Sequence, residues 1–334
     1  MKKNNLLNDI YYCKDFVKTY LRPGEEIFEF SYNEGLDYLY SLSIKKPISK
    51  IGETSIKSEY FDLETPHSYG GYISSTNCKF FLTRAFSELK LKCIKENIIA
   101  EFISFHPSNE FLVNNPTFFD FFSKDREIVF IDLRDSRADR INKYSPTTRN
   151  IIKKSTNILN VTESSDLNSF FNIYEFTMKK NNATNHYFFP KKYFESIFAL
   201  RDVKLFSVNY KNEIIAMAFI VFGNSIAHYH LSANSELSLK MHGNYYLIDF
   251  LSDYIKDNYP DITFFNLGGG RSNLESDLLL RFKSKFSHIR KFFYIAGNVY
   301  NSYVYDSYIS KFNQLYPKQK DDLFFLKYRS QSCE

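Results

Sequence analysis

The sequence predicts an α/β protein built as two tandem domains of one fold, each with a mixed β-sheet and covering helices. The order of the expected elements is the first reason. Three strands, a helix and a strand occur in the first half of the chain and recur, among further helices, in the second half. The second reason is size, because 334 residues with 44% hydrophobic content can fill a core in each domain. Strands and helices do not alternate strictly, so a doubly wound sheet is not predicted.

The first half begins with two strands expected to pair with each other, at 26–33 and 39–47, followed by a third strand at 57–66. An amphipathic helix is expected at 78–97. A strand at 98–107 completes the set.

The second half shows a clearer order of ten elements. Asp166 is suited to cap the N-terminus of the first helix, and a Lys211-Asn212 turn joins two strands. The expected elements are a strand at 159–165, helices at 167–182 and 191–200, strands at 203–210, 213–223 and 225–233, a helix at 244–258, a strand at 262–270, a helix at 276–286 and a strand at 289–297.

The joint between the domains is expected near 137–155, where charge is dense and Pro146 interrupts any helix. A crossing at the surface costs less there than a crossing through a core. The predicted division is an N-terminal domain at 1–143, a C-terminal domain at 144–316 and a tail at 317–334.

Composition narrows the class of protein without naming a function. The net charge of +5 is mild and spread along the chain, which permits nucleic-acid binding but does not argue for it. The cysteines Cys13, Cys78, Cys93 and Cys333 show neither a C-x-x-C motif nor ligand-like spacing, so no disulfide framework and no metal site are expected. We also expect no membrane span and no signal peptide, and hence a cytoplasmic protein.

Three contiguous glycines, Gly268 to Gly270, end the strand at 262–270 and precede a helix. Their spacing matches neither the Walker phosphate loop nor the G-x-G-x-x-G dinucleotide fingerprint. We therefore interpret them as spacers that let backbone approach backbone or ligand beside a cleft.

The element order and the motifs at 60–73, 144–155, 227–233 and 266–287 together resemble the FemAB-like branch of the GNAT acyltransferase superfamily. The resemblance covers about residues 10 to 315. It implies two tandem GNAT-like domains with a cleft between them, the first on the acceptor side and the second on the acyl-donor side.

The resemblance implies an acyltransferase, with two activities open. One transfers acetyl from acetyl-CoA to an amino sugar, on a sugar nucleotide or a surface polysaccharide precursor. The other transfers an aminoacyl group from tRNA to a peptidoglycan precursor. The chain lacks the long helical hairpin that many tRNA-dependent members carry, which favours acetyl-CoA as the donor. A degenerate pair of domains that only binds a partner is a third reading, and neither DNA nor a metal is expected.

For the donor, GNAT enzymes hold the CoA pyrophosphate at a helix N-terminus with the pattern Gln/Arg-x-x-Gly-x-Gly/Ala. The matching positions here are Lys240, Gly243 and Asn244, followed by Tyr245 where a small residue is expected. These residues are the predicted cofactor site, and a plain helix cap at Gly243 is the alternative.

For catalysis, the assigned residues are His230, Lys283 and Asp277. Strand alternation puts His228 and His230 on one face, and a neutral imidazole at His230 suits a general base, although a structural histidine is as consistent. Lys283 could stabilise an oxyanion or bind a carboxylate or phosphate, as the resemblance implies for the Phe-Lys pair. Asp277 and Arg281 could instead form a surface pair.

For the acceptor, the resemblance points to the first-domain motif at 60–73. The assigned residues in both halves are Glu64, Tyr69, Gly70, Gly71, Tyr187 and Phe282. The alternative is that Pro66 and the two glycines only shape a turn between strand and helix.

Overall fold

The computed structural model describes residues 6–66, 68–183, 187–272, 274, 276–319 and 324–330. The chain forms two compact units: unit 1 comprises Met1–Leu7, Tyr11–Asp125 and Phe293–Glu334, and unit 2 comprises Asn8–Ile10 and Arg126–Phe292. The boundaries between these units, at Asp125/Arg126 and Phe292/Phe293, differ from those of the predicted domains 1–143, 144–316 and 317–334. Part of the expected tail, 320–323 and 331–334, lies outside the described residues.

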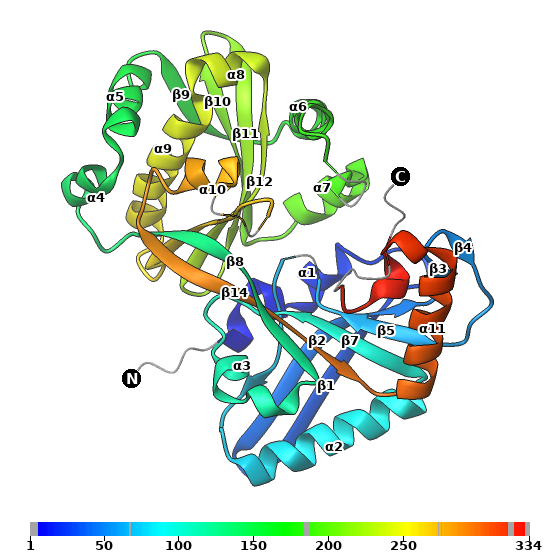
Figure 1. Ribbon diagram of the computed structural model, residues 1–334. Helices are drawn as coiled ribbons and strands as arrows, with labels where there is room; N and C mark the ends of the chain where they lie inside the picture. Colours follow the sequence, from blue (N-terminus) through cyan, green and yellow to red (C-terminus); the bar gives the residue numbers. More distant parts are fainter. Residues whose placement is uncertain are drawn as a thin grey trace. The chain divides into compact units, whose positions relative to one another are not determined.

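The sheet of unit 1 has the strand order β1-β2-β5-β7-β14, with the short β6 paired to β2 (Figure 1). Its pairs are antiparallel except β5 with β7, which is parallel. A separate small sheet joins β3 and β4. The strands are β1 (Glu26–Glu34), β2 (Asp37–Pro47), β3 (Lys50–Ile51), β4 (Thr54–Ser55), β5 (Phe61–Glu64), β6 (Ile73–Ser74), β7 (Ile98–Ser104) and β14 (Ile289–Val299).

Helices cover both faces of this sheet. On one face α2 (Lys79–Lys95) and α3 (Phe111–Asn114) contribute to a core rich in aromatic residues. On the other face α11 (Ser302–Leu315) packs on β7 together with a 3₁₀ turn at Lys327–Arg329. The short α1 (Lys14–Lys18) packs on β1 and β2. Further 3₁₀ turns occur at Leu6–Asn8, Ile10–Tyr12, Pro116–Phe118 and Pro317–Gln319.

The sheet of unit 2 has the strand order β8-β13-β12-β11-β10-β9. The pair β12 with β13 is parallel and the other pairs are antiparallel. Lys211, with φ of +54°, makes the predicted turn between β10 and β11. The strands are β8 (Phe121–Asp132), β9 (Leu159–Ser164), β10 (Val203–Tyr210), β11 (Glu213–Phe222), β12 (Ile226–Asn234) and β13 (Phe264–Gly269).

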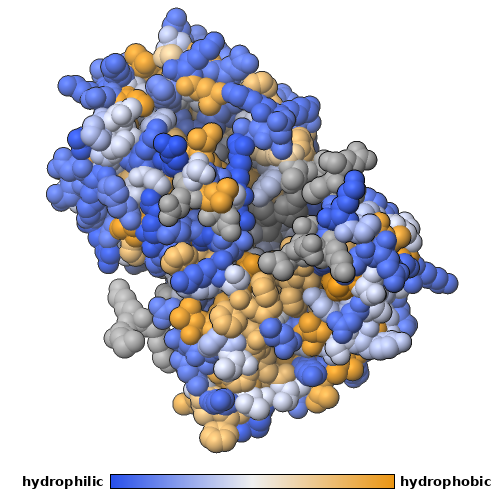
Figure 2. All heavy atoms as spheres, viewed as in Figure 1, coloured by the Kyte–Doolittle hydropathy of each residue, from blue (hydrophilic) through white to orange (hydrophobic). Residues whose placement is uncertain are grey.

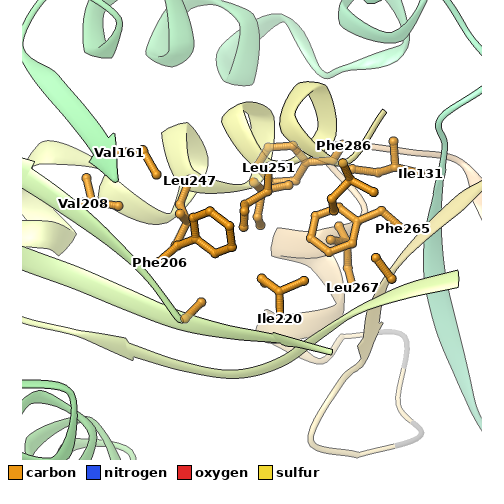
Figure 3. Close-up of a cluster of buried hydrophobic side chains, with 14 of the residues drawn as sticks. Ile131, Val161, Phe206, Val208, Ile220, Leu247, Leu251, Phe265, Leu267 and Phe286 are labelled. Atoms are coloured by element: carbon orange, nitrogen blue, oxygen red, sulfur yellow. The ribbon is translucent and has the colours of Figure 1, made fainter. Parts of the chain in front are cut away.

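The helices of unit 2 lie on both faces of its sheet (Figure 1). They are α4 (Arg137–Lys143), α5 (Pro146–Ser155), α6 (Leu167–Lys180), α7 (Lys191–Phe198), α8 (Glu236–Met241), α9 (Gly243–Asn258) and α10 (Leu278–Lys283). Leu247 and Leu251 of α9 pack on Phe206 and Ile220 of the sheet in a continuous apolar core (Figure 3). Asp166 caps α6 as predicted, because its Oδ1 accepts a hydrogen bond from Ser169 N at 2.9 Å.

The mixed sheets with helices on both faces confirm the predicted fold class. Both β8 and β14 continue from one unit into the other, because the unit boundaries fall inside them, at Asp125/Arg126 and Phe292/Phe293. No helix in the described part of the chain has the length and hydrophobicity that crossing a membrane requires.

Candidate active site

A pocket of about 360 Å³ opens in unit 2. Strand β12, the helices α6, α8 and α10, the start of α9, and the connections that carry Tyr187 and His242 form its wall. The lining residues are Tyr174, Met178, Tyr187, Tyr229, His230, Leu231, Ser232, Asn234, Ser238, Leu239, His242, Asn244, Tyr245, Leu279, Phe282 and Lys283. Of the predicted site residues, the pocket thus brings together His230, Asn244, Tyr187, Phe282 and Lys283.

A bulge in β12 explains why four consecutive residues, 229–232, line the pocket. The pairing with β11 shifts register, so that Phe219 lies opposite Leu231 while Ile220 lies opposite Tyr229. The extra residue is His230, and a bulge re-aims side chains that would otherwise alternate between faces. His228 is buried and does not line the pocket; its Nδ1 lies 3.1 Å from Asn266 Nδ2. Ala227 and Tyr229 pack in the core beneath α9, whereas His230 reaches Tyr193 of α7. His228 and His230 therefore share the face of β12 that lies away from α9, as strand alternation predicts, although only His230 lines the pocket.

His230 is neutral at physiological pH. Burial lowers the pKa of His230 to about 4, because a charged imidazolium loses its hydration there. Its Nε2 lies 3.0 Å from the hydroxyl oxygen of Tyr193 on α7. A side chain with this pKa accepts or donates a hydrogen bond readily but is a weak base.

Lys283, at the end of α10, brings an ammonium group to the pocket wall although it is only 9% exposed. Its Nζ donates a hydrogen bond to the carbonyl oxygen of Gly269 at 2.8 Å. Burial lowers the pKa of Lys283 to about 7, while Asp277 raises it and Arg126 lowers it further. Perturbed lysines of this kind are common in active sites.

The glycine stretch makes room for this lysine. Gly268 has φ of +75°, and a Cβ there would lie 3.1 Å from Lys283 Nζ. A Cβ at Gly270 would lie 2.6 Å from Asp277 Oδ1. Both positions therefore need glycine for close approach, as the spacer interpretation predicts.

Asp277 holds the turn between the glycines and α10. Its Oδ1 accepts hydrogen bonds from Leu279 N and Leu280 N at 2.9 Å, and its Oδ2 from Arg271 N at 3.0 Å and Ser272 N at 3.1 Å. Although burial raises the pKa of Asp277, these N–H groups outweigh it and hold the pKa below its usual range. Asp277 is the N-cap of α10, not a pocket-lining residue, and it positions the helix that carries Lys283.

The predicted donor residues lie at the start of α9. Gly243 is buried as the first residue of the helix, preceded by His242 with φ of +58°. Asn244 lines the pocket, whereas Lys240 is exposed on α8 and is absent from the lining. The ring of Tyr245 packs edge-on against Phe282 at 4.9 Å, and its hydroxyl accepts a hydrogen bond from Lys285 Nζ at 2.9 Å.

A hydrogen-bonded group between α6, β12 and α8 forms another part of the wall. Asn234 N donates to Thr177 Oγ1 at 2.9 Å, and Ser238 Oγ donates to Asn234 Oδ1 at 2.9 Å. Tyr174 Oη donates to the carbonyl of Tyr187 at 2.8 Å. Sequence reasoning named only Tyr187 among these residues. The others come from three separate elements, and no local motif joins them.

The predicted acceptor residues belong to unit 1. Glu64 ends β5, and its Oε2 lies 2.6 Å from Lys46 Nζ. Tyr69 is 9% exposed and has edge-on ring contacts with Tyr11, His106 and Phe293.

Gly70 and Gly71 have structural roles in this turn. Gly70 N donates to the carbonyl of Ser104, and Gly70 pairs with Phe105. Gly71 has φ of +99° and leaves no room for a Cβ beside Phe105. The role of these residues in acceptor binding stays a prediction.

Charge in the pocket is one-sided. Among its described lining residues none is Asp, Glu or Arg, and the one lysine is Lys283. Across the residues that the structure describes, no group of three His, Cys, Asp or Glu side chains is arranged to hold a metal ion.

No family model matches the chain, and no curated protein matches it. Solved structures do. FemX is 12% identical with a TM-score of 0.71, covering 91% of this chain and 94% of that chain. The C-terminal domain of a protein from Agrobacterium fabrum described as a lysylphosphatidylglycerol synthetase is 12% identical with a TM-score of 0.54, covering 93% of each chain.

A conserved protein of unknown function from Bacteroides thetaiotaomicron is 12% identical with a TM-score of 0.52, covering 78% of this chain and 85% of that chain. At such identities the likeness concerns the fold. The chain has the FemAB-like, GNAT-type fold, as its motifs predict.

Proposed function

We propose that this chain is an acyltransferase that moves an acyl group from an activated ester or thioester to an amine, with the reacting carbonyl held in the pocket of unit 2. The observation that carries the proposal is Lys283, a buried ammonium on the pocket wall with a pKa of about 7. A desolvated cation stabilises negative charge that develops on a carbonyl oxygen far better than a solvated one does.

The reaction needs few steps. The neutral acceptor amine attacks the carbonyl carbon, a C–N bond forms, and the carbonyl oxygen becomes an oxyanion. The intermediate collapses, the bond to the leaving oxygen or sulfur breaks, and the amine proton passes to the leaving group. In this scheme the Lys283 ammonium stabilises the oxyanion and supplies a proton to the leaving group, regaining one from the acceptor nitrogen.

The role of His230 in this scheme is weaker than the sequence suggests. A pKa of about 4 makes the imidazole a poor base for an ammonium acceptor. We propose that His230, held beside the Tyr193 hydroxyl, instead orients the acyl group by a hydrogen bond.

An aminoacyl ester is the donor that we favour, and the acceptor is then the amine of a peptidoglycan precursor. Tyr245 lies in the first turn of α9, where acetyl-CoA enzymes of this fold have a small residue beside the pyrophosphate. The likeness to FemX and to the lysylphosphatidylglycerol synthetase domain supports the same choice. The absence of acidic residues from the described pocket lining favours an acyl group without a cationic side chain.

Acetyl transfer from acetyl-CoA to an amino sugar is the second candidate. It is supported by the start of α9, where Gly243 is buried and Asn244 lines the pocket, since a helix N-terminus offers N–H groups to a pyrophosphate. Both donors are cytoplasmic compounds, so either candidate agrees with the expected cytoplasmic location.

The experiment compares donors directly. Purified protein is incubated with radiolabelled aminoacyl-tRNA or radiolabelled acetyl-CoA, each with a peptidoglycan precursor or an amino-sugar nucleotide, and product is counted. We expect transfer from aminoacyl-tRNA that ribonuclease abolishes. Lys283→Ala should lower kcat by about 10² to 10³, the usual effect of removing an oxyanion donor.

Arg281→Ala is the matched control, because Arg281 is an exposed cation on the same helix. It should leave kcat within about twofold, the range of a surface change. Transfer from acetyl-CoA alone would select the second candidate. Failure of all donors to react or bind would refute an acyltransferase and leave a domain pair that only binds a partner.

A further inference from the structure

Helix α2 of unit 1 exposes three large apolar side chains on one stripe. Phe80 is 80% exposed, Leu91 is 61% exposed and Ile94 is 50% exposed. At 3.6 residues per turn, Leu91 and Ile94 lie within about 40° of Phe80 around the helix axis. The opposite stripe, with Phe81, Leu82, Ala85, Leu89 and Cys93, is buried against the sheet.

The tip of the β1–β2 hairpin, which carries a further exposed apolar residue, is joined to α2 by an ion pair. Glu34 at the end of β1 accepts a hydrogen bond from Arg84 Nε of α2 at 2.7 Å, which holds the hairpin tip beside the helix. Leu36, two residues further on, is 97% exposed. Figure 2 shows hydrophobic and hydrophilic residues side by side in the region of unit 1 where Figure 1 has α2.

Basic residues flank the stripe on both sides. Over its 17 residues α2 carries five basic residues and one acidic residue. Lys95 and Arg84 lie to one side of Phe80, and Lys90 lies to the other, each within about 80° around the axis. Lys79, Lys90 and Lys95 are exposed.

We infer that the outer face of α2, with Leu36 beside it, docks this protein on an anionic membrane surface. Exposed Phe, Leu and Ile in the middle of a helix face, with Lys and Arg at its borders, suit the boundary between headgroups and acyl chains. Each lysine near an anionic surface adds attraction. The helix lies in the plane of the surface and does not span it.

The charge on this face also argues against its being a contact between two copies of the chain. A symmetric contact through α2 would bring Lys90 and Lys95 of both copies to one interface, where like charges repel. An anionic lipid surface neutralises the same lysines. The inference does not depend on the proposed reaction, because none of these residues lines the pocket of unit 2.

The test is vesicle sedimentation of the full chain with phosphatidylcholine alone or mixed with phosphatidylglycerol. We expect binding to the mixed vesicles that weakens at high salt. Lys90→Gln and Lys95→Gln should each lower partitioning about fivefold, and Phe80→Gln and Leu91→Gln about tenfold. The matched controls are Tyr303→Gln and Lys311→Gln on α11, both exposed, which should change nothing.

Three results would overturn the inference: equal binding to neutral and anionic vesicles, no vesicle binding, or equal losses in the α11 controls. Self-association abolished by Phe80→Gln would assign the face to a second copy and also overturn it. Thermal unfolding by circular dichroism checks that each variant is folded. Transfer activity on a water-soluble acceptor should be unchanged in the α2 variants, which separates this test from that of the reaction.

Discussion

At the scale of single residues, Lys283 makes the stability of unit 2 depend on pH. Its pKa is about 7 in the folded protein and near 10.5 when unfolded. Between these values the unfolded chain binds more protons, so the free energy of unfolding rises with pH, by at most about 1.4 kcal/mol per pH unit. Below about pH 7 lysine is charged in both states, and its burial destabilises the fold.

Lys283→Met should therefore raise the free energy of unfolding at pH 7 by roughly 2 kcal/mol, with a gain that shrinks as the pH approaches 10. Urea unfolding from about pH 6 to about pH 9, followed by tyrosine fluorescence because the chain has no tryptophan, measures this. Arg281→Met is the exposed control on the same helix. A gain that stays constant with pH would mean that Lys283 is not perturbed.

A second prediction concerns Gly243 at the start of α9. A Cβ there would lie 2.6 Å from Ser238 Oγ, so Gly243→Ala requires Ser238 to move away from Asn234 Oδ1. Ser238→Ala removes that oxygen. In a double-mutant cycle the two changes should cost less together than separately, by about 1 kcal/mol. If the two losses in the free energy of unfolding simply add, the close contact is contradicted. Acetyl-CoA titrations of Gly243 variants should be read together with this stability measurement.

Individual site residues differed in how far the sequence could predict them. Lys283 and Phe282 were named from the family resemblance, and the pocket contains both. The bulge at His230 leaves no mark in the sequence, because it depends on how β11 pairs with β12. Strand alternation puts Ser232 on the face of His230 but Tyr229 on the opposite face, so Tyr229 was not expected to share the pocket.

At the scale of elements, Asp277 couples the cap of α10 to the charge of Lys283. Asp277→Asn keeps one acceptor oxygen for Leu279 N and Leu280 N but presents an amide to Arg271 N and Ser272 N. This substitution should lower the free energy of unfolding by about 1 to 2 kcal/mol. The Asp277 charge raises the pKa of Lys283, so its removal should lower that pKa below 7. The pH at which the free energy of unfolding begins to rise, here called the pH midpoint, should then also fall below 7.

Unfolding over the same pH range measures that midpoint. Asp166→Asn is the control, because Asp166 caps α6 in the same way without any part in the pKa of Lys283. An Asp277→Asn midpoint equal to that of the wild type would show that the carboxylate acts only through its hydrogen bonds.

Elements were predicted best where hydrophobic period and turn residues agreed, as for the β10–β11 hairpin. The joint expected at 137–155 forms α4 and α5, and its role as the boundary between domains stays a prediction. Pro146 separates the two helices, as predicted, and is the first residue of α5, where Ser145 is an N-cap that accepts from Thr148 N. Proline is favoured at the first helical position, where its missing N–H costs nothing.

At the scale of the whole molecule, the sequence predicted the repeated order of elements. It did not predict that β8 and β14 would each belong partly to one unit and partly to the other. Residues 295–299 of β14 pair with β7 of unit 1, and residues 128–132 of β8 pair with β13 of unit 2. Pairings between strands so far apart in sequence leave no local pattern. The C-terminal chain consequently returns to unit 1, where Leu326 and Tyr328 are buried.

This return suggests that a single C-terminal residue controls the stability of unit 1. Arg329 Nε lies 2.5 Å from Oδ2 of the fully buried Asp62, and Tyr328 Oη donates to Oδ1 at 2.7 Å. Burial raises the pKa of Asp62 to about 6, although Arg329 and Tyr328 partly oppose this shift by stabilising the carboxylate. The folded state therefore binds more protons than the unfolded state between about pH 4 and pH 6, and stability falls as the pH rises through that window.

Arg329→Ala should cost about 3 to 5 kcal/mol at pH 7, because it leaves a buried carboxylate without its cation. The pKa of Asp62 should then rise further, so the loss of stability should extend above pH 6. Lys318 is an exposed cation in the same C-terminal segment, so Lys318→Ala should change neither the free energy of unfolding nor the pKa of Asp62. Adding Asp62→Asn to Arg329→Ala should recover part of the loss and abolish its pH dependence. If urea unfolding of Arg329→Ala shows the same loss at pH 5 and pH 8, the ion pair does not anchor the C-terminal segment.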